Sequence, residues 1–374
     1  VKQGPTSWYY TIPGVILASD RVYTVSARAR DYAGNYSTVY STYAFTYDSL
    51  PPYASVSFPL HSATYSRVKL STPIAGSSNQ DDQAEPYSKV SSVLVQITSG
   101  TLCFNGAAFG ACPYWLPTSG APDAWSYNDA DLDFSGDMEY VVEAKAVDHA
   151  GNESAPAAVA IKFDVNGPAS KIIYPLPGFT TGFAYVAGTA ADAADAFRAD
   201  LATYSVRVAF KRVSGPGTDY GWWNGANFAA VNANPTWFEA ALSTFGVNSG
   251  KFTYALPGAL QAYLTDPLKQ NSVYRVVPWS LDLALNPEYG PAPGLPQNAH
   301  IPPGAGVTVN FDPERPVSRV TLPSQPAYNS LPVIAGTSKD NIAVAETRIT
   351  VYLVDTDRYY DPSFPGAWSP TGQT

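Results

Sequence analysis

The sequence predicts an all-β protein built of tandem antiparallel β-sandwich domains in a linear rod. Three observations lead to this prediction. Segments of about four to eight residues with alternating apolar and polar side chains are separated by Gly, Pro and Asn turns. Charged residues make up only 14% of the 374 residues, while Tyr, Pro and Gly number 26, 33 and 28. Several landmarks also recur along the chain in one order, as in a repeat protein.

One phrase occurs in three copies and closes each repeat. It reads YTVSARARDYAGN at Tyr23–Asn35, YVVEAKAVDHAGN at Tyr140–Asn152 and, in a more divergent form, YRVVPWSLDLALN at Tyr274–Asn286. The first half of the phrase alternates, which places its apolar side chains on one face of a strand. The Asp and Asn of the second half are typical turn residues. The phrase therefore predicts a strand followed by a turn.

Other landmarks precede the phrase in every repeat. An Asp is followed four residues later by Pro, and another Pro comes seven residues after that. A Gly-polar-Asp stretch, an alternating strand, a hairpin turn and an aromatic pair follow. These landmarks divide the chain into the second half of a repeat at 1–49, complete repeats at 50–165 and 166–313, and the first half of a repeat at 314–374. This is the form of a window of a longer array, or of a subunit whose ends complement each other in a polymer.

The closing phrase resembles the F strand and FG turn of the immunoglobulin-like and fibronectin III-like repeats of large bacterial surface proteins and adhesins. The resemblance covers nearly the whole chain at the level of the repeat, and it specifies architecture rather than a ligand. It implies that Tyr23, Tyr140 and Tyr274 are tyrosine-corner residues at the start of strand F. It also implies a location outside the cell or at the surface of a bacterium.

The third repeat, residues 166–313, departs from this pattern within its closing phrase. Ala144 and Gly151 of the preceding copy are replaced by Pro278 and Leu285. Because proline cannot donate a ladder hydrogen bond, its presence in a strand indicates an edge or a bulge.

The same repeat is longer because of insertions, for which we expect short helices and a loop. The segment ADAADAFRADLA at 191–202 suits a short helix. Thr236 and Glu239 have the spacing of a capping box, which predicts a helical turn. Residues 289–306 form a loop rich in Pro and Gly. These insertions are where a specific contact would lie.

Two cysteines, Cys103 and Cys112, enclose a short segment. In an oxidising compartment they are expected to form a disulfide, and the alternative is two buried thiols. Two cysteines without a nearby His are too few for a zinc site.

The tryptophans have two interpretations. Trp8, Trp125 and the Trp222–Trp223 pair occupy repeat positions, which favours anchors of the core or of an interface. The alternative is a platform on which sugar rings stack.

The charge and the motifs argue against several classes of function. A formal charge of −9 does not suit nucleic acid or anionic membranes, and no apolar run reaches the ~18–20 residues of a membrane span. His61, His149 and His300 lie far apart in the sequence, with no nucleophile motif and no phosphate-binding loop. The sequence therefore does not predict an enzyme.

Aspartates are the candidate metal ligands. In a sandwich of this topology, the linker Asp, the loop after the second strand and the Asp of the closing turn meet at one end. The groups are Asp48 with Asp81 or Asp82 and Asp148; Asp164 with Asp192 or Asp195 and Asp282; and Asp312 with Asp340. Converging carboxylates repel unless a cation joins them, and Ca²⁺ prefers such oxygen ligands. The alternative, compatible with the first, is that each Asp shapes its turn by accepting backbone N–H bonds.

The expected function is structural: a stalk, rod or fibre segment of a large extracellular bacterial surface protein of the adhesin type, rigidified by calcium between its domains. Its partners would be neighbouring repeats of the same or of identical chains, without nucleic acid and without a membrane span in this segment. Two alternatives stay open. One is a module that binds a glycan or a surface protein, and the other is a self-complementing subunit of an extracellular filament.

Overall fold

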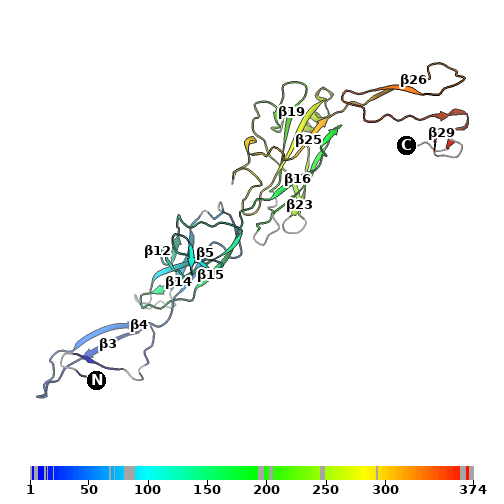
Figure 1. The fold of residues 1–374 in the computed structure, drawn as a ribbon. Helices are drawn as coiled ribbons and strands as arrows, with labels where there is room; N and C mark the ends of the chain where they lie inside the picture. The colour runs from blue at the N-terminus through cyan, green and yellow to red at the C-terminus, as the bar shows by residue number, and fades with distance from the viewer. Residues whose placement is uncertain are drawn as a thin grey trace.

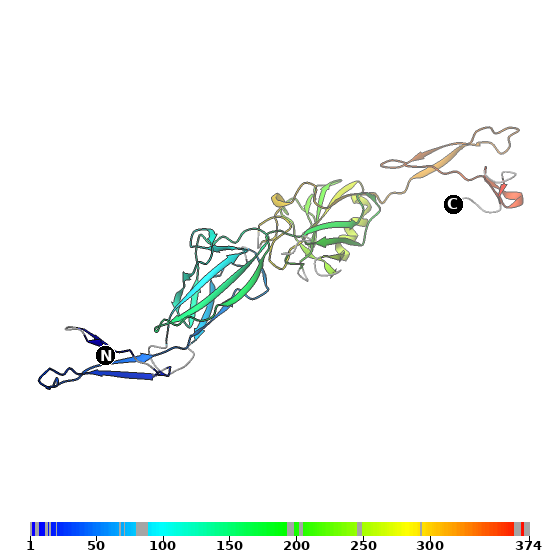
Figure 2. The ribbon, with the colours of Figure 1, turned by 60° about the horizontal axis from the view of Figure 1, so that its bottom comes forward.

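The computed structural model describes the chain except for residues 1, 4–6, 12–13, 15, 20, 67–68, 71, 80–88, 193–197, 202–204, 245–248, 292–293, 363–367 and 370–374. Two β-sandwiches follow one another in an elongated molecule, with a partial unit beyond each of them (Figures 1 and 2). The two chain ends lie at opposite ends of the molecule. Strands dominate every unit, which confirms the predicted all-β tandem fold.

The first sandwich consists of two sheets that pack face to face. One sheet has the order β12 (Ser119–Ala121), β13 (Ala124–Tyr127), β7 (Ile74–Asn79), β5 (Tyr53–Phe58). The other has the order β10 (Phe109–Ala111), β9 (Leu102–Phe104), β8 (Val90–Ser99), β14 (Met138–Asp148), β15 (Ala157–Phe163), β6 (Thr64–Tyr65), with β11 (Leu116–Pro117) beside β8. In this sandwich β6 and β15 pair in parallel, and the other strand pairs among its described residues are antiparallel. The sheets β5–β7–β13 and β8–β14–β15 have the arrangement of an immunoglobulin-like sandwich.

Alternation along β14 explains the core of this sandwich. Tyr140, Val142, Ala144 and Ala146 are at most 2% exposed and pack against the opposite sheet. The residues between them are only partly buried. Because successive side chains of a strand point to opposite faces, this alternation places the apolar side chains of β14 on the face that covers the core.

The hairpin of β9 and β10 is closed by a disulfide. Cys103, which is fully buried, is bonded to Cys112, immediately after β10. The expected disulfide is therefore present, and it joins the two ends of a short hairpin at the edge of the larger sheet.

The second sandwich repeats this plan with additions. One sheet has the order β16 (Ala169–Tyr174), β18 (Tyr185–Ala191), β23 (Ser249–Ala255), β22 (Ala241–Thr244). The other has the order β17 (Gly178–Thr180), β25 (Val307–Phe311), β24 (Ser272–Trp279), β19 (Arg207–Ser214), β20 (Gly221–Trp222), with β21 (Phe238–Glu239) beside β19. The helical elements are α1 (Gly258–Thr265), η1 (Pro267–Lys269) and η2 (Asn298–His300).

A second apolar layer covers the outer face of β24 and β19. Trp222, Trp237 and Trp279 pack there with Ile301 in a cluster separate from the main core. The indole N–H groups of Trp237 and Trp279 donate to the carbonyl oxygens of Pro296 (2.9 Å) and Tyr289 (3.0 Å). The insertion at 289–306 is thus held against the sheet by buried indoles. The rings of Trp125, Trp222 and Trp223 are at most 1% exposed, so they offer no platform for a sugar.

The predicted helical turn at Thr236–Leu242 is wrong. Phe238 pairs with Val208 of β19, and Ala241–Thr244 pairs with β23. The spacing of Thr236 and Glu239 matches a capping box, but the chain forms an edge strand there instead. Trp237, just before this strand, is buried against Trp279, which a helical turn would not allow. Within the segment 191–202, the described residues are not helical: β18 ends at Ala191, and Leu201 bridges to Asp282.

Pro278 lies inside β24 without a bulge at that position. It pairs with Val208 of β19, whereas the pairing of β24 with β25 ends at Val276. Pro278 therefore occupies a part of the strand that has an open edge on one side, which is where a residue without an N–H donor is tolerated.

The flanking units are open. The first contains β1 (Lys2–Gln3), β2 (Trp8–Tyr9) and the long hairpin of β3 (Arg21–Ala27) and β4 (Ser41–Tyr47). The last contains β26 (Val317–Leu322) paired with β27 (Ala335–Lys339), and the sheet β28 (Tyr352–Leu353), β29 (Arg358–Tyr360), β30 (Trp368–Ser369), with η3 (Val354–Thr356). The register of β26 shifts two residues before its end, as it does in β5 and β16.

We expect Trp279→Ala to destabilise the second sandwich by about 3–5 kcal/mol, because it removes a buried ring that holds the 289–306 loop. Chemical unfolding followed by tryptophan fluorescence measures this change. Val231→Ala, at an 88% exposed position of the same sandwich, is the control and should change stability by less than about 0.5 kcal/mol. Equal, small effects of the two substitutions would show that the outer layer does not stabilise the fold.

Candidate metal centre at the junction of the two sandwiches

The Asp and Asn of the closing phrase form the same hydrogen-bonded turn in all three copies. In the third copy, the backbone N–H of Asn286 donates to Asp282 Oδ1 (2.8 Å) and its Nδ2 donates to Asp282 Oδ2 (2.9 Å). The pairs Asp148–Asn152 and Asp31–Asn35 make the same two bonds. The Asp therefore does shape a turn.

The position before Asn takes a left-handed backbone conformation in every copy. Gly34 and Gly151 have φ values of +96° and +93°. Leu285, which replaces the glycine, still adopts a φ of +71°. The turn is thus kept even where the residue type disfavours it.

The same Asn side chain also reaches across to the preceding unit. Asn286 Nδ2 donates to the backbone carbonyl of Asp164 in the linker (3.0 Å), and Asn152 Nδ2 donates to that of Asp48 (3.3 Å). In the described part of the chain, Asn35 bonds only within its own turn. Sequence reasoning missed this second role of the Asn, although its presence at the end of all three copies was a signal for it.

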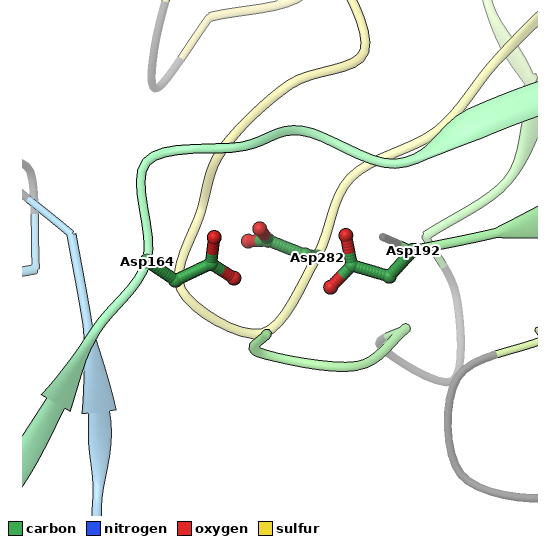
Figure 3. Close-up of side chains that lie close together, drawn as sticks. All are labelled: Asp164, Asp192 and Asp282. Atoms are coloured by element: carbon green, nitrogen blue, oxygen red, sulfur yellow. The ribbon is translucent and has the colours of Figure 1, made fainter. Parts of the chain in front are cut away.

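Three carboxylates converge where the first sandwich joins the second (Figure 3). Asp164 lies in the linker after β15, Asp192 follows β18, and Asp282 begins the turn after β24. One oxygen from each lies within 4.8 Å of the others, and the residues are 0%, 4% and 0% exposed. The structure therefore brings together three of the predicted ligands, while Asp195 is outside the described residues.

Backbone donors orient two of these carboxylates. Asp164 Oδ1 accepts from the N–H of Asn166 (3.0 Å), and its Oδ2 accepts from the N–H of Ala199 (2.6 Å). Ala199 belongs to the loop after β18, so Asp164 ties the linker to that loop. Asp282 is held by Asn286, so its position depends on the turn.

Burial changes the protonation of this cluster. Burial raises the pKa of Asp164 to about 7, and the charges of Asp282 and Asp192 add to the effect. Burial also raises the pKa of Asp282 to about 6, again with a contribution from Asp192. In the exposed first copy, by contrast, the hydrogen bond from the Asn35 side chain lowers the pKa of Asp31. The same turn thus holds a carboxylate that is readily ionised when exposed and reluctantly ionised at the junction.

Further contacts cross this junction. The Ser66 hydroxyl donates to the carbonyl of Ala284, and Lys69 Nζ donates to that of Leu283 (3.2 Å). Gly167 of the linker fits so closely against the turn that a Cβ there would lie 2.1 Å from the Pro287 oxygen. The first sandwich and the linker therefore both contact the closing turn of the second sandwich.

The other predicted groups are only partly placed. At the first junction Asp148 is buried, and Asp48 Oδ1 accepts from Ser19 Oγ (3.0 Å) and the N–H of Leu50 (3.0 Å). Asp81 and Asp82 lie outside the described residues. At the last junction Asn341 Nδ2 donates to Asp312 Oδ1 (3.2 Å), and Asp340 Oδ2 accepts from the N–H of Ile342 (3.3 Å).

The predicted tyrosine-corner residues differ in their bonding. Tyr140 OH donates to the Ser135 carbonyl (2.8 Å), and Tyr23 OH lies 3.4 Å from that of Ala18, each five residues earlier. The Tyr274 hydroxyl is buried and makes no bond to the carbonyl five residues earlier, a residue that the structure describes, and burial raises its pKa. The third repeat thus keeps the ring in the core but not the corner bond.

Each of the three histidines contacts a backbone group, and the three contacts lie in separate places. The Ala160 N–H donates to His61 Nδ1 (3.2 Å), His149 Nδ1 lies 2.7 Å from the Lys89 carbonyl, and the Gln297 N–H donates to His300 Nδ1 (3.2 Å). Among the described residues, no helix is long and apolar enough to cross a membrane.

No protein-family model matches the chain, and no curated protein matches it. Among solved structures, it is similar to the fibronectin(III)-like modules of Clostridium thermocellum CbhA, at 11% identity over 69% of this chain and 94% of that one, with a TM-score of 0.26. It is also similar to a tetra-tandem repeat from the extending region of a large adhesion protein (15% identity, 82% and 60% coverage, TM-score 0.24). A third similar structure is the D00–D0 domain of intimin, at 13% identity over 69% of this chain and 96% of that one, with a TM-score of 0.21.

These neighbours are tandem domains of the type that the closing phrase resembles. Because the TM-scores are low, the fold assignment rests on the strand order and pairing described above.

We expect Asn286→Ala to loosen the junction, because it removes the bond to the Asp164 carbonyl as well as the bond within the turn. The loss should be about 1–3 kcal/mol in the unfolding of the second sandwich, with an altered small-angle X-ray scattering profile, because bending at the junction shortens an elongated molecule. Asn35→Ala removes only the equivalent bond within the turn and should leave the scattering profile unchanged. If both substitutions alter the profile equally, the cross-junction bond has no role in orienting the sandwiches.

Proposed function

We propose that the chain is a segment of a rod or stalk of an extracellular bacterial surface protein, in which calcium ions bound at the junctions hold successive β-sandwiches in line. The observation that carries the proposal is the convergence of Asp164, Asp192 and Asp282. Each comes from a different segment, one in the linker and two in the following sandwich. An ion that joins them would therefore fix the linker against the domain that follows it.

The chemistry of the cluster fits Ca²⁺ better than other common metals. Its donors are carboxylate oxygens, with no His or Cys in the group, which disfavours zinc. Ca²⁺ takes six to eight oxygens in flexible geometry, whereas Mg²⁺ demands a near-ideal octahedron and keeps several waters. Calcium would offset two of the three negative charges, and so reduce the repulsion that adds to burial in raising the pKa values of Asp164 and Asp282.

The neighbouring junctions offer independent support. Asp48 Oδ2 and Asp340 Oδ1 are buried oxygens that have no hydrogen-bond partner among the described residues. They belong to the residues that correspond to Asp164 and Asp192 in the repeat. A buried acceptor without a donor is unfavourable, and a cation at each junction would satisfy both atoms.

An extracellular location is supported by the disulfide and by the composition. The bond between Cys103 and Cys112 forms and persists in oxidising compartments. Calcium is also abundant outside cells, where the sites of modular proteins bind it with affinities as weak as about 10⁻⁴–10⁻³ M.

Adding calcium to the chelated chain should raise the melting temperature of the second sandwich. With calcium at about 100 times its dissociation constant, the gain is about 2.7 kcal/mol, or roughly 5–10 °C. Calorimetric titration and thermal melts measure binding and stability. Asp282→Asn should abolish the effect, because it removes a ligand charge.

Asp31→Asn is the matched control for that experiment. It makes the same change in the same turn, but at a site without the other two carboxylates among the described residues, so the calcium response of the second sandwich should persist. A chain that neither binds calcium nor melts differently in its presence would contradict the proposed role.

In chelator, stability should fall as the pH rises from about 4 to about 7. The folded-state pKa values of Asp164, about 7, and Asp282, about 6, exceed the value of ~3.9 for an unfolded Asp. The folded state therefore binds more protons in this range, so its stability is greatest below the unfolded pKa and is lost as the pH passes the folded values. With calcium the stabilisation should instead grow with pH, because the ion competes with protons.

Thermal melts across this pH range, with and without calcium, test the prediction. The slope in chelator should be shallower in Asp282→Asn, which cannot titrate at that position. A melting temperature in chelator that rises from pH ~5 to ~7 in the unmodified chain, with no change in the variant, would contradict it.

A further inference from the structure

A strand of two residues, β6, forms one edge of the first sandwich. It pairs in parallel with β15, the last strand of this domain, opposite Lys162 and Phe163. Two flanking bonds extend this edge: the Lys162 N–H donates to the Ala63 carbonyl (3.0 Å), and the Asp164 N–H donates to the Tyr65 carbonyl (2.9 Å). In the second sandwich the corresponding strand β17 pairs with β25 at three positions. The edge at β6 is therefore the shorter of the two and has fewer ladder bonds to hold it.

The second sandwich contacts β6 through carbonyl oxygens of its closing turn. The Ser66 hydroxyl, immediately after β6, donates to the Ala284 carbonyl, and Ser66 is only 2% exposed. Lys69 Nζ donates both to the Thr64 carbonyl of β6 (3.0 Å) and to the Leu283 carbonyl of the turn (3.2 Å). One ammonium group thus bonds to both domains, and its charge strengthens both bonds.

The linker between the two sandwiches is bonded to both β6 and the turn. The backbone N–H of Asp164 donates to Tyr65 of β6, while its carbonyl accepts from Asn286 of the turn. A little further along, a Cβ on Gly167 would lie 2.1 Å from the Pro287 oxygen, so the linker and the turn fit closely. The turn, the linker and β6 therefore form one connected set of contacts, and movement of the turn changes the support of β6.

We propose that β6, together with Ser66 and Lys69, is the surface on which a sandwich receives its successor, and that the docked successor holds β6 on the edge of the sandwich before it. The partner is the closing turn of the following sandwich, bound through its backbone carbonyls. The β6 edge of the first sandwich is fully stable only while the second is docked on it. Contacts of this kind make the stability of a repeat depend on its neighbour. The coupling does not need the proposed calcium ion.

Hydrogen exchange of the backbone amides, measured on the full chain in chelator and resolved to single residues, tests the coupling. The reporters are the amides of Ser62 and Lys162, which donate to carbonyls across the edge between β6 and β15. Ser66→Ala removes one bond across the junction and should speed their exchange about three- to tenfold. Ser57→Ala is the matched control: its exposed hydroxyl donates to Ala75 within the same sandwich (3.1 Å), and its loss should leave the reporters unchanged.

Gly167→Ala displaces the turn by a change that lies outside the first sandwich. Its methyl group would meet the Pro287 oxygen, so the two reporter amides should exchange at least about tenfold faster. Gly304→Ala, with no atom within 4 Å of its Cβ position, is the control and should have no effect. Because Ser66→Ala and Gly167→Ala act on the same contact, adding the first to the second should cause no further change.

The edge at β6 has to respond to a change outside its own domain. Exchange at Lys162 that stays unchanged in Gly167→Ala would overturn the proposal, because the edge would then be stable without the docked turn. An effect of Ser66→Ala that persists undiminished in the Gly167→Ala chain would also overturn it, since Ser66 would then act within the first sandwich alone. If the Gly167→Ala chain does not fold, Asn286→Ala loosens the same turn from the second sandwich and gives the same test.

Discussion

The arrangement of the units depends on one side chain with two tasks, the Asn that ends the closing phrase. Within its own domain, Asn286 satisfies both oxygens of Asp282 and so fixes the turn. Its remaining donor direction reaches the linker carbonyl at Asp164. Because one amide serves both contacts, the turn cannot move without moving the linker. The orientation of one sandwich on the next thus follows from the internal geometry of the second.

The same turn has different electrostatics at the two places where its exposure differs most. At Asp31 it is open to solvent, and hydrogen bonds favour the charged form. At Asp282 the preceding domain excludes water and two further carboxylates are near, so the charged form is disfavoured despite identical hydrogen bonds. Burial therefore converts a structural turn into a candidate ion site. The turn and calcium interpretations of these aspartates do not compete, because the first provides the geometry that the second needs.

Much of this was accessible from the sequence because strand order determines which loops share an end of a sandwich. That reasoning brought Asp164, Asp192 and Asp282 together in advance. It did not reveal the bond from Asn286 to the linker, because the turn alone already explains an Asn there and the recurrence of the Asn was not read further. The strands at Phe238–Glu239 and Ala241–Thr244 were missed because a local capping pattern was weaker than pairing with β19 and β23. The sequence held one sign of the outer layer at Trp279: the apolar and polar residues stop alternating in the second half of β24, where both faces of the strand are buried.

The cross-junction bonds of Asn152 and Asn286 end on main-chain carbonyls, not on side chains. A carbonyl is present whatever residue occupies the linker position, so this bond requires no particular side chain in the linker. Two sandwiches with different loops and different outer layers therefore make the same bond to the linker that precedes each of them. Duplication or exchange of whole units by recombination would keep this one contact at every new junction, whatever the sequence of the linker.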